Sequence, residues 1–214
     1  WGTSGNRLYL NDGSGLLSDG TSAAGVRRGF WGWASCLADF DNDGHLDVFH
    51  VNGFSQPRAA EFFSDPAVLF LANGDGTFTE RAAELGLWEA DQGRGVSCSD
   101  VDGDGAIDIL VHNNLGPLRL WRNNAKRAGH HLVVRLSAPP PNARGIGARV
   151  ALSAGGRTQW RTIRADAIAF IARGIRSAQD AGYCPGVDPE LTASSLSSIS
   201  RPQPAPCRCT WPAR

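Results

Sequence analysis

The sequence predicts an all-β protein made of β-propeller blades, incomplete at about two blades, followed by a small β segment and an irregular or disordered tail. Three observations lead to this prediction: two acidic loops with the same spacing, short apolar segments directly after them, and a longer repeat that contains both. The loops read D-x-D-x-D-G-x-x-D, occupy residues 39–47 and 100–108, and begin 61 residues apart.

Each acidic loop places four carboxylates within nine residues, so its charges repel one another unless a cation lies between them. Oxygen ligands at alternating positions, with glycine at the sixth, fit calcium coordination. Solvated Asp-Gly turns use the same residue types for local reasons, but two matching loops favour a cation. We expect about two Ca²⁺ ions, bound by aspartate side chains and by the backbone carbonyl of each seventh residue. The expected ligands are Asp39, Asp41, Asp43, His45 and Asp47 in the first loop, and Asp100, Asp102, Asp104, Ala106 and Asp108 in the second.

The segments that follow the loops are β-branched and apolar, and each ends at Asn or Gly. Residues 46–51 and 107–112 are therefore predicted to be strands that end in turns. An EF-hand would instead have helices on both sides and a Glu at position 12, where this chain has His50 and Val111. The loops are expected to join strands, and a dockerin-like or EF-hand-like assembly module is the alternative.

A longer repeat surrounds both loops. Residues 8–15 resemble residues 70–78, because both run from apolar residues through an Asn to a Gly-rich turn, and a third copy begins at Leu118. Its marker asparagines are 62 and 50 residues apart, and an insertion of 11 residues near 53–66 explains most of the difference. These asparagines are Asn11, Asn73 and Asn123. Repeats of this length with several short strands each are typical of propellers.

On these residues the chain resembles the FG-GAP/VCBS repeat proteins. The resemblance rests on L-Y-x-N before a Gly-rich turn, a Gly-Val or Gly-Leu step, and A-D-F-D-N-D-G-x-L-D-V, and it covers about residues 6–124. It implies propeller blades over residues 1–125, with a calcium loop between two strands of a blade. It also implies the same eight aspartates as calcium ligands.

A second resemblance concerns the following segment. Residues 142–150 (N-A-R-G-I-G-A-R-V) resemble the start of the ASPIC/UnbV domain, which implies a small β domain over residues 126–165. Residues 131–136 are predicted to be a strand, and residues 147–153 and 157–163 a hairpin around a Gly-rich turn.

The last segment, residues 166–214, is expected to be irregular or disordered. The resemblance fades near Ile163, and the end of the chain is rich in Ser, Pro and Arg. A shift of reading frame would explain the lost similarity, and translation of the other frames tests that hypothesis.

The net charge is zero, but the acidic and basic side chains are unequally distributed between the two parts of the chain. Residues 1–125 hold 17 acidic and 8 basic side chains (net −9), and residues 126–214 hold 4 acidic and 13 basic ones (net +9). The arginines are scattered without interleaved aromatic residues, so nucleic-acid binding is not expected. No stretch approaches the roughly 18 apolar residues of a membrane span. With no Met and about two blades, the sequence is interpreted as a piece of a longer protein, since propellers close with roughly 4–8 blades.

Four residues near the loops invite specific interpretations. Cys36 and Cys98 precede the two loops, and we interpret them as small buried apolar side chains, with a disulfide as the alternative. His50 and His112 follow the loops and are expected on the blade surface.

No catalytic constellation is found. The G-x-S-x-G, H-E-x-x-H and Walker A motifs are absent. The acidic residues are better explained as calcium ligands than as catalytic carboxylates. Trp31 and Trp33 are expected to pack between blades, and a stacking platform for a sugar or a peptide is the alternative.

The sequence therefore predicts a calcium-binding extracellular interaction or adhesion module that is not an enzyme, with calcium in a structural role. Its expected partner is an extracellular protein or glycan. Sites with Kd of order 0.1–1 mM fill outside cells, so an extracellular or cell-surface location is expected, with the periplasm left open. A non-catalytic part of a secreted carbohydrate-active or enediyne-associated biosynthetic enzyme is the alternative from another class.

Overall fold

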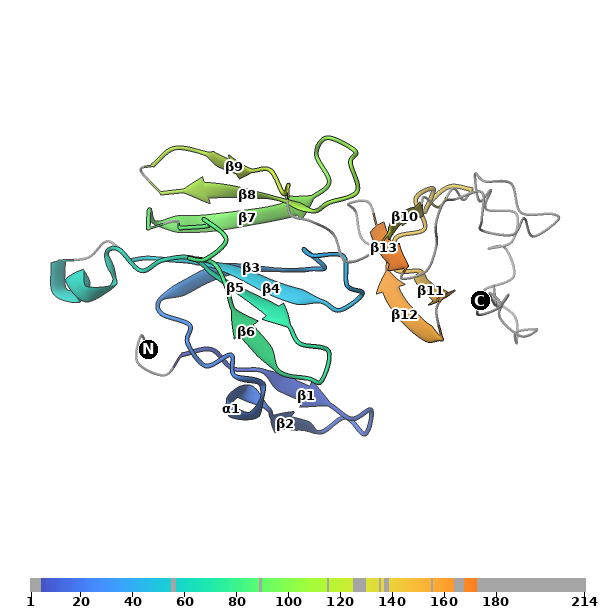
Figure 1. Ribbon diagram of the computed structural model, residues 1–214, viewed down its shortest axis with the longest axis horizontal. Helices are drawn as coiled ribbons and strands as arrows, with labels where there is room; N and C mark the ends of the chain where they lie inside the picture. Colours follow the sequence, from blue (N-terminus) through green and yellow to red (C-terminus); the bar gives the residue numbers. More distant parts are fainter. Residues whose placement is uncertain are drawn as a thin grey trace. The chain divides into compact units, whose positions relative to one another are not determined.

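A computed structural model describes residues 5–54, 57–88, 90–114, 116–124, 130–134, 136, 139–154, 156–163 and 168–172. The fold is nearly all β, as predicted, and consists of several small antiparallel sheets (Figure 1). The chain divides into two compact units. The first comprises Trp1–Phe40, His45–Asp102 and Ala106–Asn124, and the second comprises Asp41–Gly44, Gly103–Gly105 and Ala125–Arg214.

The first unit is built from three sheets. A hairpin of β1 (Tyr9–Asn11) and β2 (Leu17–Asp19) precedes the short helix α1 (Thr21–Ala24). The central sheet has four antiparallel strands in sequence order: β3 (Gly32–Ala38), β4 (Asp47–Asn52), β5 (Val68–Ala72) and β6 (Phe78–Glu80). The third sheet has three: β7 (Gly93–Ser99), β8 (Asp108–Asn113) and β9 (Arg119–Trp121).

The predicted insertion near 53–66 is present, because the two larger sheets differ in the length of the connection between their second and third strands. The connection from β4 to β5 contains the 3-10 helix η1 (Pro57–Phe62), whereas β8 and β9 are joined by residues 114–118. Each acidic loop joins two strands, as predicted. In each of the two larger sheets, the first strand pairs with the second as a hairpin.

Pairing within the sheets corrects the repeat alignment by one residue. Val48 and Ile109 each follow the ninth residue of a loop, and they pair with Phe70 and Trp121 respectively. Phe70 and Trp121 are therefore equivalent. Counting on from them, the structural counterparts are Ala72 with Asn123 and Asn73 with Asn124, so the sequence-based match of Asn73 with Asn123 is wrong.

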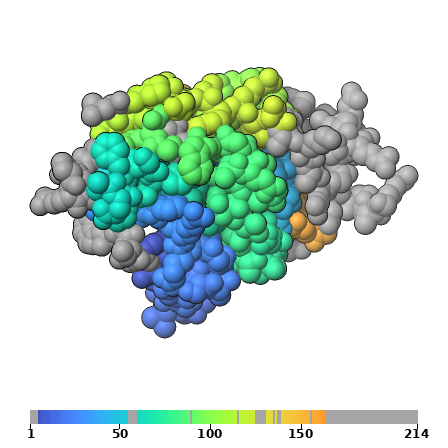
Figure 2. Space-filling view, turned by 60° about the vertical axis from the view of Figure 1, so that its left-hand side comes forward, coloured from blue at the N-terminus to red at the C-terminus, as the bar shows by residue number. Residues whose placement is uncertain are grey.

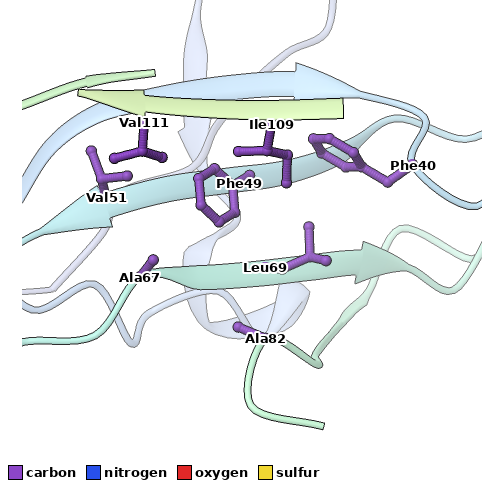
Figure 3. Close-up of a cluster of buried hydrophobic side chains, with 8 residues drawn as sticks. All are labelled: Phe40, Phe49, Val51, Ala67, Leu69, Ala82, Ile109 and Val111. Carbon is purple, nitrogen blue, oxygen red and sulfur yellow. The ribbon is translucent and has the colours of Figure 1, made fainter. Parts of the chain in front are cut away.

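The main core lies between the central sheet and the β7–β9 sheet (Figure 3). Alternation along β4 explains it, because successive strand residues point to opposite faces. Phe49 and Val51, both fully buried, pack with Ile109 and Val111 of β8. Burial of side chains of this size typically stabilises a fold by about 1.5–3 kcal/mol each.

The other face of the central sheet is covered by the N-terminal segment. Val68 and Phe70 of β5 pack with Ala24 and Val26, which follow the β1–β2 hairpin. These N-terminal elements and the β5–β6 region lie side by side on the surface (Figure 2). A cavity of about 390 Å³ remains beside this contact, and its lining includes the half-exposed Trp33.

The second unit contains two small sheets. β11 (Arg149–Ala154) and β12 (Arg157–Thr162) form the predicted hairpin, and β10 (His130–Val134) pairs with β13 (Ile168–Ala172). Val134 and Ile163 form a small core with neighbouring apolar residues. β13 is a strand inside the segment 166–214 that was predicted to be irregular, and residues 173–214 of that segment lie outside the described residues.

Candidate metal centre

The acidic loops connect the first two strands of each large sheet. Ala38 pairs with Asp47 across the first connection and Ser99 with Asp108 across the second, so the ninth residue of each loop begins a strand. The fourth and sixth loop positions have left-handed backbone conformations. They are Asn42 (φ 62°) and Gly44 (φ 95°) in the first loop, and Gly103 (φ 77°) and Gly105 (φ 84°) in the second. Glycine and asparagine adopt this conformation with the least strain, which explains the residue types at these positions.

Each loop brings three carboxylates together. Oxygen atoms within 4.8 Å of one another come from Asp39, Asp41 and Asp43 in the first loop, and from Asp100, Asp102 and Asp108 in the second. Of the eight aspartates predicted as ligands, six are thus gathered, whereas Asp47 and Asp104 fall outside these two groups. Such clusters of hard oxygen atoms suit a divalent cation such as calcium or magnesium.

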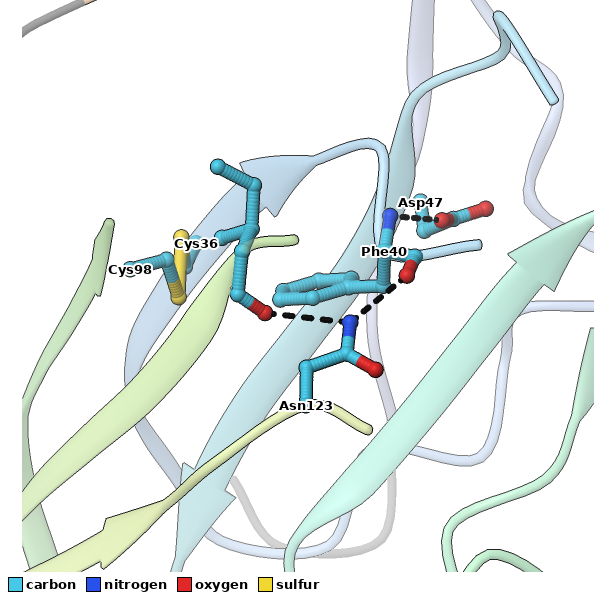
Figure 4. The surroundings of a disulfide bond; sticks show 6 residues. Cys36, Phe40, Asp47, Cys98 and Asn123 are labelled. Carbon is cyan, nitrogen blue, oxygen red and sulfur yellow. Dashed lines mark hydrogen bonds between the residues drawn. A yellow bond between two sulfur atoms is a disulfide. The ribbon is translucent and has the colours of Figure 1, made fainter. Parts of the chain in front are cut away.

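The ninth aspartate of each loop also has a structural role that the sequence did not reveal. Asp47 Oδ2 accepts from Phe40 N (2.8 Å; Figure 4), and Asp47 Oδ1 accepts from Ala72 N (2.9 Å). Asp108 Oδ2 accepts from Val101 N (2.9 Å) and Oδ1 from Asn123 N (2.8 Å). Both carboxylates are almost fully buried. Asp47 therefore joins the start of its loop to β5, the third strand of its sheet, and Asp108 joins the start of its loop to Asn123, two residues after the end of β9.

The two loops are linked to each other by side-chain amides. Asn42 Nδ2 donates to Gly105 O (3.2 Å), and Asn123 Nδ2 donates to Phe40 O (2.7 Å) and Ile107 O (3.2 Å). Sequence analysis singled out neither Asn42 nor the bridging role of Asn123. The motif spacing predicts the ligands of one loop but carries no information about contacts between two loops.

The surroundings of the two clusters differ in burial and charge. Asp39 is buried and Asp41 and Asp43 are half-buried, whereas Asp102 in the second loop is exposed. Asp102 also forms an ion pair with Arg122 of the following segment (Nε to Oδ2, 2.5 Å). The second cluster thus includes an exposed carboxylate that is paired with an arginine, while in the first loop Arg157 Nη1 donates to the backbone carbonyl of Asp43 (3.4 Å).

The two residues predicted to contribute backbone carbonyls differ in their surroundings. His45 is half-buried, and its side chain lies against Gly74 in the β5–β6 turn. Ala106 is almost fully buried at the base of the second loop.

Cys36 and Cys98 form a disulfide, so their interpretation as free buried side chains is wrong. They lie on β3 and β7, the first strands of the two large sheets, with 6.4 Å between their Cα atoms (Figure 4). Cys36 lies three residues before its loop and Cys98 two residues before its own. This offset of one residue turns the two side chains toward each other, since alternate strand residues face opposite sides.

One of the two histidines also differs from the prediction. His112 is exposed as expected, but His50 is only 5% exposed and does not lie on the surface. His50 Nε2 lies 3.1 Å from Asn6 Nδ2. Burial lowers the pKa of His50 from its ordinary value of 6.5 to about 4, with a smaller opposing effect from the Asn52 side chain. The repeat counterpart of His50 is Val111, not His112, which explains the different faces.

The two tryptophans pack around the insertion. Trp31 stacks on Phe54 with 4.2 Å between ring centroids and contacts Phe62 of η1. Trp33 is 47% exposed, and the guanidinium of Arg94 in β7 lies 4.2 Å from its ring centroid. Trp33 therefore contributes to the contact between the two sheets, as expected, while half of its side chain faces solvent.

Residues 1–50 match the FG-GAP-like repeat. This FG-GAP-like segment runs from the N-terminal hairpin through the first acidic loop into β4. Similar curated proteins are Cartilage acidic protein 1 from Homo sapiens, 43% identical over 68 residues, and its counterparts from Mus musculus and Xenopus tropicalis, each 41% identical over 68 residues. The alignments cover 29% of this chain and 10% of each relative. In the part of the chain that the structure describes, no helix combines the length and the apolar character needed to traverse a bilayer.

Proposed function

We propose that this chain is a calcium-stabilised extracellular interaction module in which each acidic loop binds one calcium ion. The observation that supports this most directly is the convergence of three carboxylate oxygens within 4.8 Å in each of two loops. Like charges held so close repel strongly in the absence of a counter-ion.

The donor set fits a hard cation. The clustered atoms are carboxylate oxygens, and the buried Asn42 Oδ1 in the first loop has no hydrogen-bond partner among the described residues. The proposed ligands remain those of the sequence prediction: Asp39, Asp41, Asp43, Asp47 and the His45 carbonyl, and Asp100, Asp102, Asp104, Asp108 and the Ala106 carbonyl. Since each loop joins two strands of one sheet, a bound ion would stabilise the hairpin rather than take part in catalysis.

An extracellular location is supported by independent features. The FG-GAP-like match and the similarity to Cartilage acidic protein 1 both favour a secreted, non-catalytic module. The Cys36–Cys98 disulfide fits an oxidising compartment, where such bonds persist. We propose an extracellular protein or glycan as the partner, and a small β domain of the ASPIC/UnbV type over residues 126–165.

The two alternatives are less well supported. Strands flank both loops, which argues against a dockerin-like or EF-hand-like module with helical flanks. A role as the non-catalytic part of a secreted enzyme stays compatible with the fold, but no specific observation favours it.

Calcium titration calorimetry of the full chain tests the proposal. Two ions should bind, and Asp43→Ala and Asp102→Ala should each remove or strongly weaken one site. Asp75→Ala is the matched control, because Asp75 lies in an exposed turn and accepts from Thr77 rather than belonging to either cluster. At a calcium concentration of about ten times Kd, each site should add roughly 1.4 kcal/mol to the free energy of unfolding.

Two results would contradict the proposal: no binding heat with the wild-type chain, or the same loss of binding in the Asp75 control. Magnesium provides a further comparison, since it keeps most of its water and should bind more weakly to a site with many protein ligands.

A further inference from the structure

One side chain donates to backbone carbonyls of both acidic loops. Asn123 Nδ2 lies 2.7 Å from Phe40 O, at position 2 of the first loop, and 3.2 Å from Ile107 O, at position 8 of the second (Figure 4). The backbone N–H of the same residue donates to Asp108 Oδ1. Three hydrogen bonds thus hold Asn123, two from its side-chain amide and one from its backbone, so a displacement of either loop backbone disturbs the contact with the other.

A second amide joins the tips of the loops. Asn42 is fully buried, and its Nδ2 donates to Gly105 O in the second loop. Asn42 has the left-handed φ of 62° that the folded first loop requires, so this hydrogen bond depends on the first loop being ordered. Gly105 directly precedes Ala106, whose carbonyl is a proposed ligand of the second ion.

We propose that Asn42 and Asn123 couple the two calcium sites, so that an ion in one loop raises the affinity of the other. This rests on the proposed function, because it presupposes that both loops bind calcium. Asn42 and Asn123 act here as positioning residues, because their side-chain amides orient the backbone of the loops.

The physical basis is shared ordering. Each loop must hold several carboxylates close together, and a cation removes the repulsion that opposes this arrangement. The bridging hydrogen bonds form only when both backbone segments are in place, so ordering one loop lowers the entropy that the other still has to lose. Repulsion between the two ions opposes this effect. With two bridges the expected coupling is about tenfold in affinity, and it must be the same in both directions.

Calorimetric titration of the full chain with calcium chloride tests the coupling. Asp41→Ala should abolish binding at the first loop, and the affinity of the second loop is then measured alone. We expect it to be about tenfold weaker than the affinity of the second loop in the wild-type chain, where the first loop is occupied. Asp102→Ala provides the reciprocal measurement at the first loop.

The bridges are then removed one at a time. Asn42→Gly deletes the amide while tolerating the left-handed backbone, and Asn123→Ala deletes the second bridge. In either background, the affinity of the second loop should become less dependent on Asp41. Asn124→Ala is the matched control, as Asn124 is the exposed neighbour of Asn123, and it should leave the tenfold difference unchanged. Melting curves establish that each variant folds, and Asn42→Gly carries the test should Asn123→Ala fail to fold.

Three outcomes would overturn the proposed coupling or a part of it. A second-loop affinity that Asp41→Ala leaves unchanged, or increases, would overturn the coupling while the proposed function stands. A coupling that persists in full in Asn42→Gly and Asn123→Ala would overturn the assignment to these amides. Absence of calcium binding to the wild-type chain would overturn the proposed function and the coupling together.

Discussion

The two large repeats carry the same acidic motif but place it in different surroundings. In the first repeat, Asp39 is buried, and a long connection containing η1 joins β4 to β5. In the second repeat, Asp102 is exposed and paired with Arg122, and the corresponding connection is short. The motif therefore brings carboxylate oxygens together in both loops, whereas neighbouring segments decide how exposed these carboxylates are and which side chains they pair with.

The same comparison explains the paired histidines and cysteines. Both residues at position 12 of their loops, His50 and Val111, are buried, while His112 one residue later is exposed. Cys36 and Cys98 differ by one residue in their distance from the loops, and so face each other. A shift of one residue along a strand exchanges the faces of a sheet, so near-equivalence in sequence is not equivalence in space.

The largest expected effect concerns the link between the repeats. Replacing both cysteines (Cys36→Ala with Cys98→Ala) should lower the free energy of unfolding by about 4 kcal/mol, from the chain entropy released by a crosslink with a separation of 62 residues. Denaturant unfolding under oxidising conditions measures this. The control pair Ser35→Ala with Ser97→Ala, exposed neighbours on β3 and β7, should change stability little. Equal stability of the cysteine variant and the wild type would refute the prediction.

The next effect tests whether the buried ninth aspartates have the same structural role in both repeats. Asp47→Ala and Asp108→Ala should each destabilise the chain by about 3 kcal/mol even with chelator present. Each variant leaves two backbone N–H groups without their charged acceptor, at roughly 1–3 kcal/mol per group. Urea unfolding in chelator gives the values. A loss seen only with calcium would mean that these residues act through the ion instead.

The histidine comparison predicts a difference in pH dependence. The folded pKa of His50, about 4, lies below its ordinary value of 6.5, so the unfolded chain binds more protons between these values and stability falls as the pH falls. The contribution of His50 should drop by about 2 kcal/mol between pH 7 and pH 5. His50→Gln should lack this component of the pH profile, whereas His112→Gln should retain it. Identical profiles for the wild type and His50→Gln would contradict the assignment.

The smallest expected effect concerns the ion pair at Asp102, which distinguishes the second loop from the first. Arg122→Gln removes the cation that competes for Asp102, so calcium affinity at the second loop should rise about twofold to fivefold, as expected for an exposed ion pair. The first loop should be unaffected. Arg119→Gln is the matched control, because Arg119 lies three residues before Arg122, in β9, and pairs with Asp91 outside both loops. A rise at both loops in calorimetry would point to a general effect of net charge.

Local chemistry was sufficient for the elements that repeat. The β-branched and apolar residues 46–51 and 107–112, each followed by Asn or Gly, predicted strands, and the Gly-rich turn at residues 154–156 predicted the β11–β12 hairpin. The left-handed conformations of Gly44 and Gly105 likewise follow from glycine at the sixth position of each loop. These features depend on a few adjacent residues, which is why they could be predicted.

What depended on packing between sheets could not be predicted in this way. The burial of His50, the disulfide and the alignment of Ala72 with Asn123 all follow from which strand faces which. The one-residue offset of the cysteines was visible in the sequence. It predicts a disulfide only once β3 is known to pack against β7.

By itself, the sequence determined the fold class, the two acidic loops and the strands on either side of them, because backbone conformation and the clustering of like charges are set by near neighbours in the chain. Only the tertiary structure decided that Asn42 and Asn123 bridge the loops, that the ninth aspartates bind the backbone at Ala72 of β5 and at Asn123 just after β9, and that Asp39 is buried whereas Asp102 is exposed. These contacts join residues from 15 to 83 positions apart, and their geometry is fixed by the packing of two sheets rather than by any local preference.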